Sequence, residues 1–598
     1  MIPTRDDRSN QAVKSWLRAL ERTAPIEREP LTTLPVVIAG LAAVHGDAPA
    51  LVSREGTLSY RALAAQANRY SRWALSQGLA AGDVVGLVMG SCPDYLACWL
   101  GITRIGATVA LINTHLSGEP LVHSLKIATP RHVVAGAEFA AAVAGARAQL
   151  PAAIRCWVRG AGDGPLPSMD AELARQAPEP PEPGSYTAPT LDARALYIYT
   201  SGTTGLPKAA NVSHRRVMHW SQWFAGLLDT QPSDRMYNCL PLYHSVGGIV
   251  ATGATLVAGG AVVLRPRFSA SGFWRDVRDE RCTLFQYIGE LCRYLVNSPP
   301  CPEEREHQLR IACGNGLRPE VWTPFQQRFG IPRVLEYYAS TEGTFSLYNC
   351  EGEPGAVGRI PGFLAHRLPV AIVRHDVGTG EPLRNAAGLC ERVAVDEPGE
   401  VIGQLPHDPG SRTGAFEGYS DSEASARKVL RDVFAPGDAW YRAGDLMRRD
   451  RRGFYYFVDR VGDTYRWKGE NVSTAEVWTS LATCTGVVEG LVYGVGVPGG
   501  DGRAGMAALV VTPEFDVQRF HREVAARLPE FARPVFLRLL PSLEITGTFK
   551  PRKQELVAEG FDPARVAGAL FVADRDRDGY VPLDGSRYAA ICAGRARL

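Results

Sequence analysis

The chain has 598 residues, of which 45% are hydrophobic and 21% charged, and its formal net charge at pH 7 is +2. A chain of this length needs more than one hydrophobic core, and its near-neutral charge argues against a nucleic-acid-binding protein. The 12 cysteines include no Cys-x-x-Cys pair, which disfavours zinc sites and disulfide frameworks and fits reduced thiols in the cytoplasm.

Residues 1–35 are predicted to form a helical extension. Val13, Trp16, Leu17 and Leu20 recur at helical spacing and share one face. Such a helix can pack on the body of the protein or lie at a lipid surface, and both interpretations stay open. We expect no signal peptide, because the charged residues near the N-terminus precede no apolar run. The expected location is cytoplasmic, with a peripheral position on the inner face of the membrane as an alternative.

Between residues 36 and 135, helices alternate with short apolar strands. The pattern predicts a helix over 60–77 and buried strands over 84–89 and 106–112. This alternation indicates layered α/β structure. A loop rich in proline and glycine at 160–192 precedes another buried strand, which we expect over 195–199.

A segment rich in glycine and hydroxyl side chains follows that strand directly. Residues 199–208 read Tyr-Thr-Ser-Gly-Thr-Thr-Gly-Leu-Pro-Lys. Glycines let backbone N–H groups approach phosphate oxygens, hydroxyls add donors, and a lysine adds positive charge. The spacing is not that of a Walker A loop. We therefore predict a phosphate-binding loop of a different kind, formed by Thr200, Ser201, Gly202, Thr203, Thr204, Gly205 and Lys208.

Two apolar stretches follow this loop. The first is a helix with an aromatic and aliphatic face between residues 220 and 228, which is read as core, with a wall of an acyl tunnel as the alternative. The second, at 246–264, is uncharged but rich in glycine, so a buried helix, a turn and a buried strand explain it better than a membrane span. Beyond residue 470, strands at 487–497 and 506–511 and a helix at 517–528 indicate a compact α+β domain.

The phosphate loop resembles the signature of the adenylate-forming (ANL) superfamily, which includes acyl-CoA synthetases, luciferases and the adenylation domains of peptide synthetases. Segments similar to further motifs follow in the family's order, at 240–244, 314–318, 337–343, 440–446 and 545–550. Two segments resemble the fatty acid transport protein branch of the superfamily, the long-chain and very-long-chain acyl-CoA synthetases. They read Gly-Asp-Thr-Tyr-Arg-Trp-Lys-Gly-Glu-Asn and Thr-Gly-Thr-Phe-Lys. The resemblance covers roughly residues 36 to 598.

This resemblance implies a role for each matching residue. Thr204 and the rest of the loop would hold the phosphates with Thr341, and Glu342 would hold Mg²⁺. The ribose would bind Asp445, with Arg460 also facing the nucleotide. The adenine would lie against Gly314, Asn315, Gly316 and Tyr338.

The remaining matches concern the second substrate and the movement of a domain. The resemblance implies that His244 stands at the entrance of the acyl channel and that Gly469 lies beside the tunnel for the CoA pantetheine. Asp463 matches the hinge about which the C-terminal domain turns between two half-reactions. Lys550 matches the catalytic lysine that steadies charge during adenylation.

The resemblance also implies the fold and the activity. The fold is α/β, with a large AMP-binding N-terminal domain of layered α/β subdomains (36–460) and a small mobile α+β C-terminal domain (461–598). The activity is that of an ATP-dependent long-chain or very-long-chain fatty acid:CoA ligase, which uses ATP, Mg²⁺ and coenzyme A. The reaction passes through an acyl-adenylate intermediate and releases pyrophosphate and AMP. Two alternatives stay open: a ligase for an aryl, sterol or bile acid, and a fatty acid carrier or uptake protein. The acyl length and the oligomeric state, a homodimer included, also stay open.

Overall fold

The computed structural model describes residues 5–160, 164, 166–200, 206–376, 379–406, 414–468, 470–498, 500, 502–544, 552–566, 568–574 and 577–596. They form two compact units. The first unit comprises Met1–Arg359 and Ala415–Arg427, and the second comprises Ile360–Gly414 and Lys428–Leu598. The predicted domains, 36–460 and 461–598, are divided at an expected hinge and not by compactness, so that division stays a prediction.

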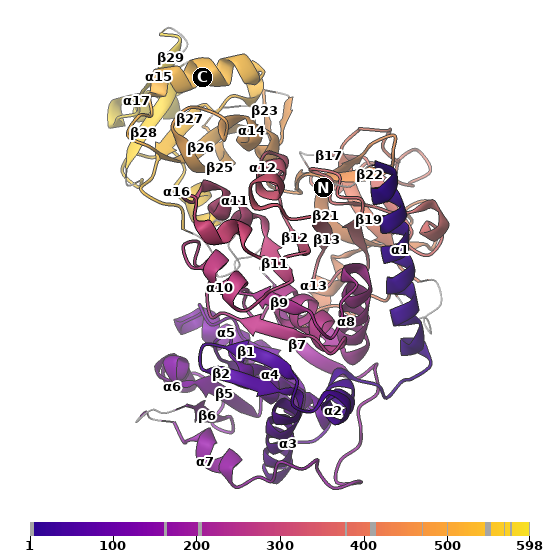
Figure 1. Ribbon diagram of the computed structural model, residues 1–598. Helices are drawn as coiled ribbons and strands as arrows, with labels where there is room; N and C mark the ends of the chain where they lie inside the picture. Colours follow the sequence, from indigo (N-terminus) through magenta and orange to yellow (C-terminus); the bar gives the residue numbers. More distant parts are fainter. Residues whose placement is uncertain are drawn as a thin grey trace. The chain divides into compact units, whose positions relative to one another are not determined.

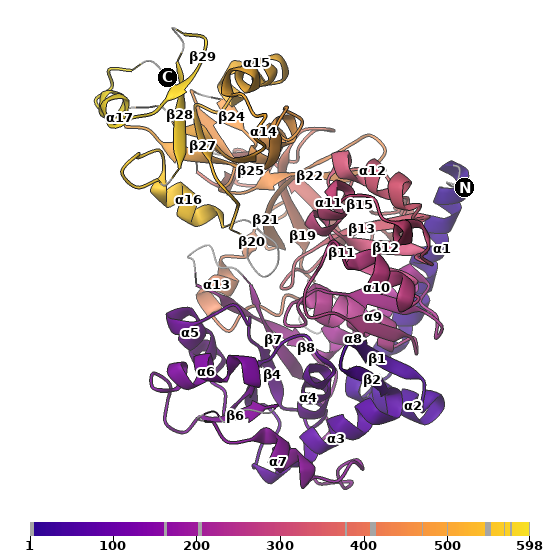
Figure 2. The ribbon, with the colours of Figure 1, turned by 60° about the vertical axis from the view of Figure 1, so that its left-hand side comes forward.

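The first unit contains a six-stranded sheet that is parallel except at one edge. Its last pair is an antiparallel hairpin, whose two strands flank the predicted phosphate loop. Helices lie around this sheet in Figures 1 and 2: α3 (Tyr60–Ser76), α4 (Pro93–Arg104), α5 (Gly118–Ala128), α6 (Ala140–Arg147) and α7 (Met169–Ala174). The strand order is β6 (Arg155–Arg159), β5 (His132–Gly136), β3 (Val84–Val88), β4 (Thr108–Leu111), β7 (Arg194–Thr200) and β8 (Lys208–Ser213).

The same unit contains an eight-stranded sheet whose central strands are parallel. Parallel strands bring their carboxyl ends to one edge of a sheet, where open α/β sheets bind ligands. Three of the expected site segments follow β9, β12 and β13 directly. The strand order is β14 (Ser346–Asn349), β13 (Arg333–Ala339), β12 (Ile311–Asn315), β11 (Leu284–Ile288), β9 (Arg235–Asn238), β10 (Ala261–Leu264), β1 (Pro49–Ser53) and β2 (Gly56–Ser59).

Helix α8 (His214–Leu228) begins with a side-chain cap and ends at a left-handed residue. The hydroxyl of Ser213 accepts a hydrogen bond from the backbone N–H of Arg216, and Asp229 ends the helix at a φ of 53°. Such a cap satisfies one of the free donors in the first turn of a helix. The cap also fixes the first turn that carries Arg216. The other helices around this sheet are α2 (Leu34–His45), α10 (Phe273–Asp279), α11 (Gly289–Asn297) and α12 (Pro319–Phe329).

The glycine-rich stretch after β9 is a buried helical segment that leads into a strand. A π-helical turn (Val246–Ala251) continues as α9 (Thr252–Leu256), and β10 follows. A Cβ atom at Gly248 would lie 2.3 Å from the carbonyl oxygen of Leu242, so only glycine fits there. This arrangement confirms the predicted helix, turn and strand. Over the part of the chain that the structure describes, no helix combines the length and the apolarity that a membrane crossing needs.

The N-terminal helix α1 (Arg5–Thr23) runs alongside α8 in Figure 1. Trp16 is 1% exposed, and its ring meets Trp223 and Tyr348 edge-on at centroid distances of 5.8 and 5.5 Å. This contact confirms a helix packed on the body of the protein. Val13 and Leu17 are exposed, so they take no part in this packing.

The second unit contains two large sheets with their own cores. Strands β16 (Val370–Val373), β19 (Gly399–Gln404), β21 (Ala439–Arg449) and β22 (Phe454–Arg460) pair in that order, and β20 (Val429–Arg431) joins β21. The second sheet is five-stranded and contacts α14 (Thr474–Leu481), α15 (Val517–Arg527) and α16 (Lys553–Glu559), as Figure 2 shows with α17 (Gly585–Cys592). Its strand order is β25 (Val487–Gly496), β26 (Arg503–Val511), β27 (Phe536–Leu539), β28 (Ala569–Asp574) and β29 (Gly579–Pro582). The predicted strands and helix beyond residue 470 are confirmed.

We predict that Trp16→Ala lowers the free energy of unfolding by about 3–5 kcal/mol, because it empties a filled site between α1 and α8. Thermal or urea unfolding of the purified chain measures the change. Val13→Ala, at a position that is 42% exposed on the same helix, is the matched control. A Trp16→Ala protein as stable as the Val13→Ala protein would contradict the packing role.

Candidate functional site

The predicted phosphate loop is closed at its base by the β7–β8 hairpin. Thr200 and Lys208 are paired across the hairpin. Helix α5 holds both strands, because Tyr199 donates a hydrogen bond to the carbonyl of Ser124 at 2.7 Å and His123 Nε2 lies 3.1 Å from the carbonyl of Pro207. Both ends of the loop are therefore fixed. Ser201, Gly202, Thr203, Thr204 and Gly205 lie outside the described residues.

Glu342 and Lys208, expected at the phosphates, both lie against Tyr419. The Tyr419 hydroxyl donates to Glu342 Oε1 at 2.8 Å, and Lys208 Nζ lies 5.8 Å from the centroid of the Tyr419 ring. Burial and the Glu342 carboxylate raise the pKa of Tyr419, so the phenol keeps its proton and can donate. Glu342 is buried, and it is not a solvated loop residue. The structure thus brings two predicted phosphate and metal residues to one tyrosine.

A single guanidinium joins three segments around this point. Arg216 donates to the carbonyl oxygens of Thr341 at 2.9 Å, Gly343 at 3.1 Å and Ala415 at 3.1 Å. Its Nε lies 3.3 Å from the carboxylate of Glu417. The planar fork of arginine suits this many acceptors in fixed directions. Arg216 therefore fixes the backbone on both sides of Glu342.

The segment that follows β9, residues 240–245, contacts Thr341, the neighbour of Glu342 in the chain. Ser245 Oγ and Thr341 Oγ1 are 3.1 Å apart and share a hydrogen bond. His244 is half-buried, and its Nδ1 accepts a weak hydrogen bond from the backbone N–H of Val246 at 3.4 Å. Because Thr341 precedes Glu342, the expected acyl entrance and the expected phosphate contact are neighbours. The role of His244 stays a prediction.

The segment expected to line the adenine pocket follows β12 in a tight turn. Gly316 has a φ of 79°, a left-handed value that favours glycine. A Cβ atom at Gly314 would lie 2.3 Å from the carbonyl oxygen of Tyr287, so the backbones approach closely. Asn315 is the last residue of β12, and Tyr338 lies near the end of the neighbouring β13, with its ring centroid 6.0 Å from that of Phe345.

A buried acid lies beneath this turn. Glu336 Oε1 accepts a hydrogen bond from the backbone N–H of Leu317 at 3.1 Å, and Oε2 lies 2.5 Å from the hydroxyl of Tyr287. Burial raises the pKa of Glu336 to about 8, although hydrogen bonds from Tyr287 and from the backbone of Leu317 and Gly316 oppose the shift. The carboxyl is therefore largely protonated at neutral pH.

The second unit holds the remaining described candidates. Asp445 and Arg460 are directly paired between β21 and β22, and Arg460 Nε lies 3.6 Å from Asp445 Oδ1. Asp463 forms an ion pair of 3.0 Å with Lys553, at the start of α16. Gly469 and Lys550 lie outside the described residues.

Asp459, next to Arg460, does not form a surface ion pair with it. The Asp459 carboxylate is buried and accepts hydrogen bonds from the backbone and the hydroxyl of Thr474, at distances from 2.6 to 3.1 Å. Desolvation raises its pKa above the usual value. Asp459 therefore anchors the first turn of α14 to the end of β22.

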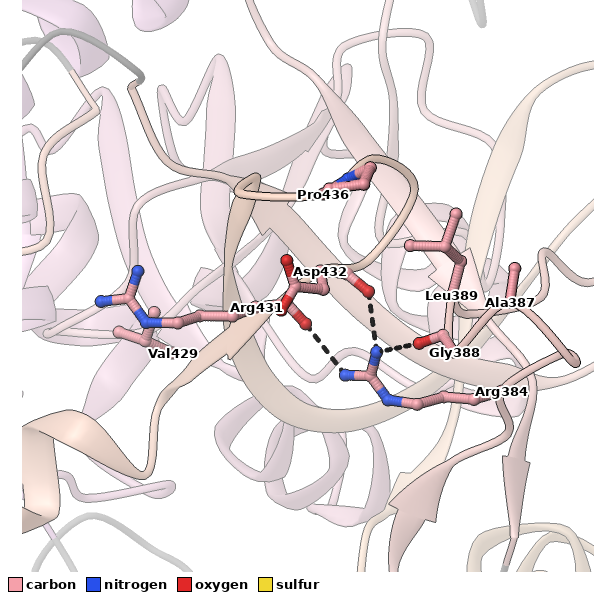
Figure 3. A pocket seen from close by; sticks show the side chains of 8 residues that line it. All are labelled: Arg384, Ala387, Gly388, Leu389, Val429, Arg431, Asp432 and Pro436. Carbon is pink, nitrogen blue, oxygen red and sulfur yellow. Dashed lines mark hydrogen bonds between the residues drawn. The ribbon is translucent and has the colours of Figure 1, made fainter.

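A surface hollow of about 610 Å³ lies elsewhere in the second unit, and Figure 3 shows its lining. Arg384 crosses it and donates to the carbonyl oxygens of Gly388, Arg431 and Asp432. These bonds occupy its guanidinium within the protein. None of the predicted site residues lines this hollow.

Four residues of the first unit were missed by sequence reasoning: Arg216, Glu336, Glu417 and Tyr419. Glu336 gave a usable signal, because it is an acid inside an apolar strand, where a charge is rarely buried without a partner. Tyr419 and Glu417 follow a loop and gave no comparable signal. Arg216 stands beside Arg215 on α8, and the sequence does not show which of the two faces inward.

Comparison with known proteins gives one family and a common fold. Residues 40–403 match the family model described as AMP-binding enzyme. The chain is 40% identical to long-chain fatty acid transport protein 1 of Mus musculus, over 94% of this chain and 88% of that protein. It is 40% identical to a medium/long-chain-fatty-acid–CoA ligase of Mycobacterium tuberculosis, over 93% and 90%. The solved structure of ATP-bound MatB from Rhodopseudomonas palustris superposes with a TM-score of 0.73 at 22% identity, over 88% of this chain and 99% of that chain. This similarity bears out the predicted α/β fold.

We predict that Arg216→Met lowers the stability of the first unit by about 3 kcal/mol, because it removes the positive charge beside the Glu417 carboxylate and the donor of three carbonyl groups. Arg215→Met is the matched control, since Arg215 pairs with the more exposed Asp192 and Glu27 and should cost about 1 kcal/mol or less. Thermal unfolding of both variants measures the difference. Equal losses would show that Arg216 does not join these segments.

Proposed function

Since this chain belongs to the family of AMP-binding enzymes, we propose that it is an ATP-dependent ligase for long-chain or very-long-chain fatty acids and coenzyme A. The observation that carries the proposal is the convergence on Tyr419 of Lys208, from the phosphate hairpin, and Glu342, from the turn after β13. A cation and a carboxylate on one phenol suit a nucleotide phosphate and its metal ion. The names of the relatives favour a fatty acid as the carboxylic acid.

The described residues suit Mg²⁺ that arrives with a nucleotide. Mg²⁺ is usually held by one or two protein carboxylates together with substrate phosphates. Glu342 supplies such a carboxylate, and the hydrogen bond from Tyr419 orients it. When bound, Mg²⁺ would neutralise charge on the phosphate oxygens.

In the first half-reaction, the fatty acid carboxylate attacks the α-phosphorus of ATP. A bond forms between the carboxylate oxygen and this phosphorus, the bond from the α-phosphorus to the bridging oxygen of pyrophosphate breaks, and the acyl-adenylate remains. The protein needs no nucleophile of its own, because positioning and electrostatics lower the barrier. In our proposal, Lys208 and the loop of residues 200–205 hold the phosphates with Thr341, and Lys550 steadies the developing charge.

In our proposal, the adenine and the ribose of the nucleoside bind to different sets of residues. Gly314, Asn315, Gly316 and Tyr338 surround the adenine, and Asp445 accepts hydrogen bonds from the ribose hydroxyls. A carboxylate has only acceptor atoms, which suits two hydroxyl donors. The 3.6 Å contact with Arg460 supports this role, because the guanidinium orients the Asp445 carboxylate.

In the second half-reaction, the sulfur of the CoA thiol attacks the acyl carbonyl carbon and its proton passes to solvent. The bond between that carbon and the phosphate oxygen of AMP breaks, so the thioester forms and AMP leaves. We propose that residues 461–598 turn about Asp463 between the two steps, which withdraws Lys550 and brings Gly469 beside the CoA pantetheine. The ion pair between Asp463 and Lys553 supports a hinge that is electrostatically held in one of its two positions. His244 stands at the acyl entrance in this scheme.

Two rival functions differ from this proposal in their chemistry. A ligase for an aryl, sterol or bile acid would use the same nucleotide residues with another acyl pocket. A fatty acid carrier or uptake protein would bind the acid without ATP turnover. A cytoplasmic location with peripheral contact to a membrane stays part of the proposal, and the exposed Val13 and Leu17 of α1 are compatible with it.

A panel of carboxylic acids tests the proposed function directly. We expect pyrophosphate release and acyl-CoA formation with ATP, Mg²⁺ and CoA to be greatest with long-chain or very-long-chain fatty acids. The purified chain is assayed against fatty acids of increasing length, benzoates and a bile acid. Preference for benzoates or the bile acid would assign another ligase, whereas no pyrophosphate and no hydroxylamine-trapped acyl group with any acid would favour a carrier.

We predict that Lys550→Ala abolishes adenylation but leaves most of the thioester formation from supplied acyl-AMP. The lysine acts on charge that develops only in the first half-reaction, where the loss should be about 10²-fold or more. Lys553→Ala, three residues away, is the control and should spare adenylation chemistry more than Lys550→Ala does. Equal loss of both half-reactions in Lys550→Ala would contradict the assigned role.

A further inference from the structure

Glu336 is a buried acid that the proposed reaction does not use. Its side chain has 2% exposure and lies within β13, between Tyr287 on β11 and the turn that follows β12. Its Oε1 accepts from the backbone N–H of Leu317 at 3.1 Å. The acid therefore holds the turn through a main-chain N–H group.

The turn is confined from a second direction. A Cβ atom at Gly289, the first residue of α11, would lie 1.8 Å from the carbonyl oxygen of Gly316. The backbone of residues 314–317 thus lies between the start of α11 and the carboxyl of Glu336. A loop held at both faces has little freedom to shift.

Glu336 also shares a strand face with the aromatic residue of the predicted adenine pocket. Residues two apart in a strand point to the same side of a sheet, so Glu336 and Tyr338 lie on one face of β13. Glu336 thereby fixes the position of the turn, residues 314–317, relative to Tyr338. Main-chain groups can distinguish the edges of a base only when they are held within about 0.5 Å of the correct place.

We propose that Glu336 is a positioning residue that fixes residues 314–317 beside Tyr338 and thereby sets the preference for adenine over other purine bases. This inference rests on the proposed ATP-dependent function. Glu336 touches no substrate in it and acts through the backbone of the turn. The residue consequently affects base selection more than it affects the acyl substrate.

The chemistry of the buried carboxyl supplies a conservative variant. With a pKa of about 8, Glu336 is mostly neutral at pH 7, and a glutamine has the shape of that neutral form. Glu336→Gln keeps an oxygen that accepts from Leu317 and an amide that can donate to the hydroxyl oxygen of Tyr287. Glu336→Ala removes the acceptor, and Glu336→Met removes it while keeping most of the volume.

The test compares ATP with ITP, whose base carries an oxygen in place of the amino group of adenine. For wild type and each variant, kcat/KM is measured with both nucleotides, a long-chain fatty acid and CoA, by pyrophosphate release. Affinities for AMP and IMP are measured by calorimetry. We expect the ATP/ITP ratio to fall about 10-fold or more in Glu336→Ala and Glu336→Met, because the buried N–H of Leu317 loses its acceptor. The ratio in Glu336→Gln should stay within about threefold of wild type, and KM for the fatty acid should change little.

Asn349→Ala is the control for general destabilisation. Asn349 is fully buried on β14, directly opposite Glu336, and its amide donates to the carbonyl oxygens of Glu353 and Ala356 and not to the turn. We expect it to lower stability while leaving the ATP/ITP ratio unchanged. An unchanged ratio in folded Glu336→Met, or an equal fall in Asn349→Ala, would overturn the inference. Wild type that binds AMP selectively but releases no pyrophosphate with any acid would overturn the proposed function alone, and the AMP and IMP affinities of the variants would then decide the inference.

Discussion

The candidate site of the first unit depends on one buried guanidinium. Arg216 accepts no hydrogen bonds and donates in fixed directions, so the carbonyl groups of Thr341, Gly343 and Ala415 must turn toward it. The Glu417 carboxylate balances its charge where water is largely excluded. Glu342 stands between two of these carbonyl groups in the chain, and its backbone is therefore fixed before any ligand binds. A preorganised carboxylate needs little rearrangement when a charged substrate arrives.

The sheet supplies the second constraint. Since β9, β11, β12 and β13 are parallel neighbours, the segments that follow them all start from one edge. Small side chains at the crossing points let these segments come within backbone contact, and the Glu336 carboxyl occupies the interior below them. A buried acid of this kind is stable because donors surround it and because it can hold its proton. The close approach of the backbones and the buried acid therefore act together to fix the segments that follow these strands.

Much of the fold could be predicted from the sequence, because strand and helix periodicity is a local property. The strands at 84–88 and 194–200 and the helix at 60–76 end within a few residues of expectation. Residues of the site could be predicted from the sequence only where they belong to motifs that occur in a fixed order, as Glu342 does. Tyr419 could not be found in this way, because it reaches Glu342 from 77 positions along the chain. The direction in which Arg216 points depends on tertiary packing, which single-sequence patterns do not encode.

The short segment 415–427 has a consequence for how the protein can be divided. It belongs to the first unit although the chain on either side of it belongs to the second, so the polypeptide passes from one unit to the other three times. A gene fragment that ends near residue 359 would therefore encode the eight-stranded sheet without the tyrosine and the carboxylate that complete its polar interior. Neither unit is one continuous stretch of the chain that ends where the other begins, so neither can be exchanged between relatives as a single uninterrupted block.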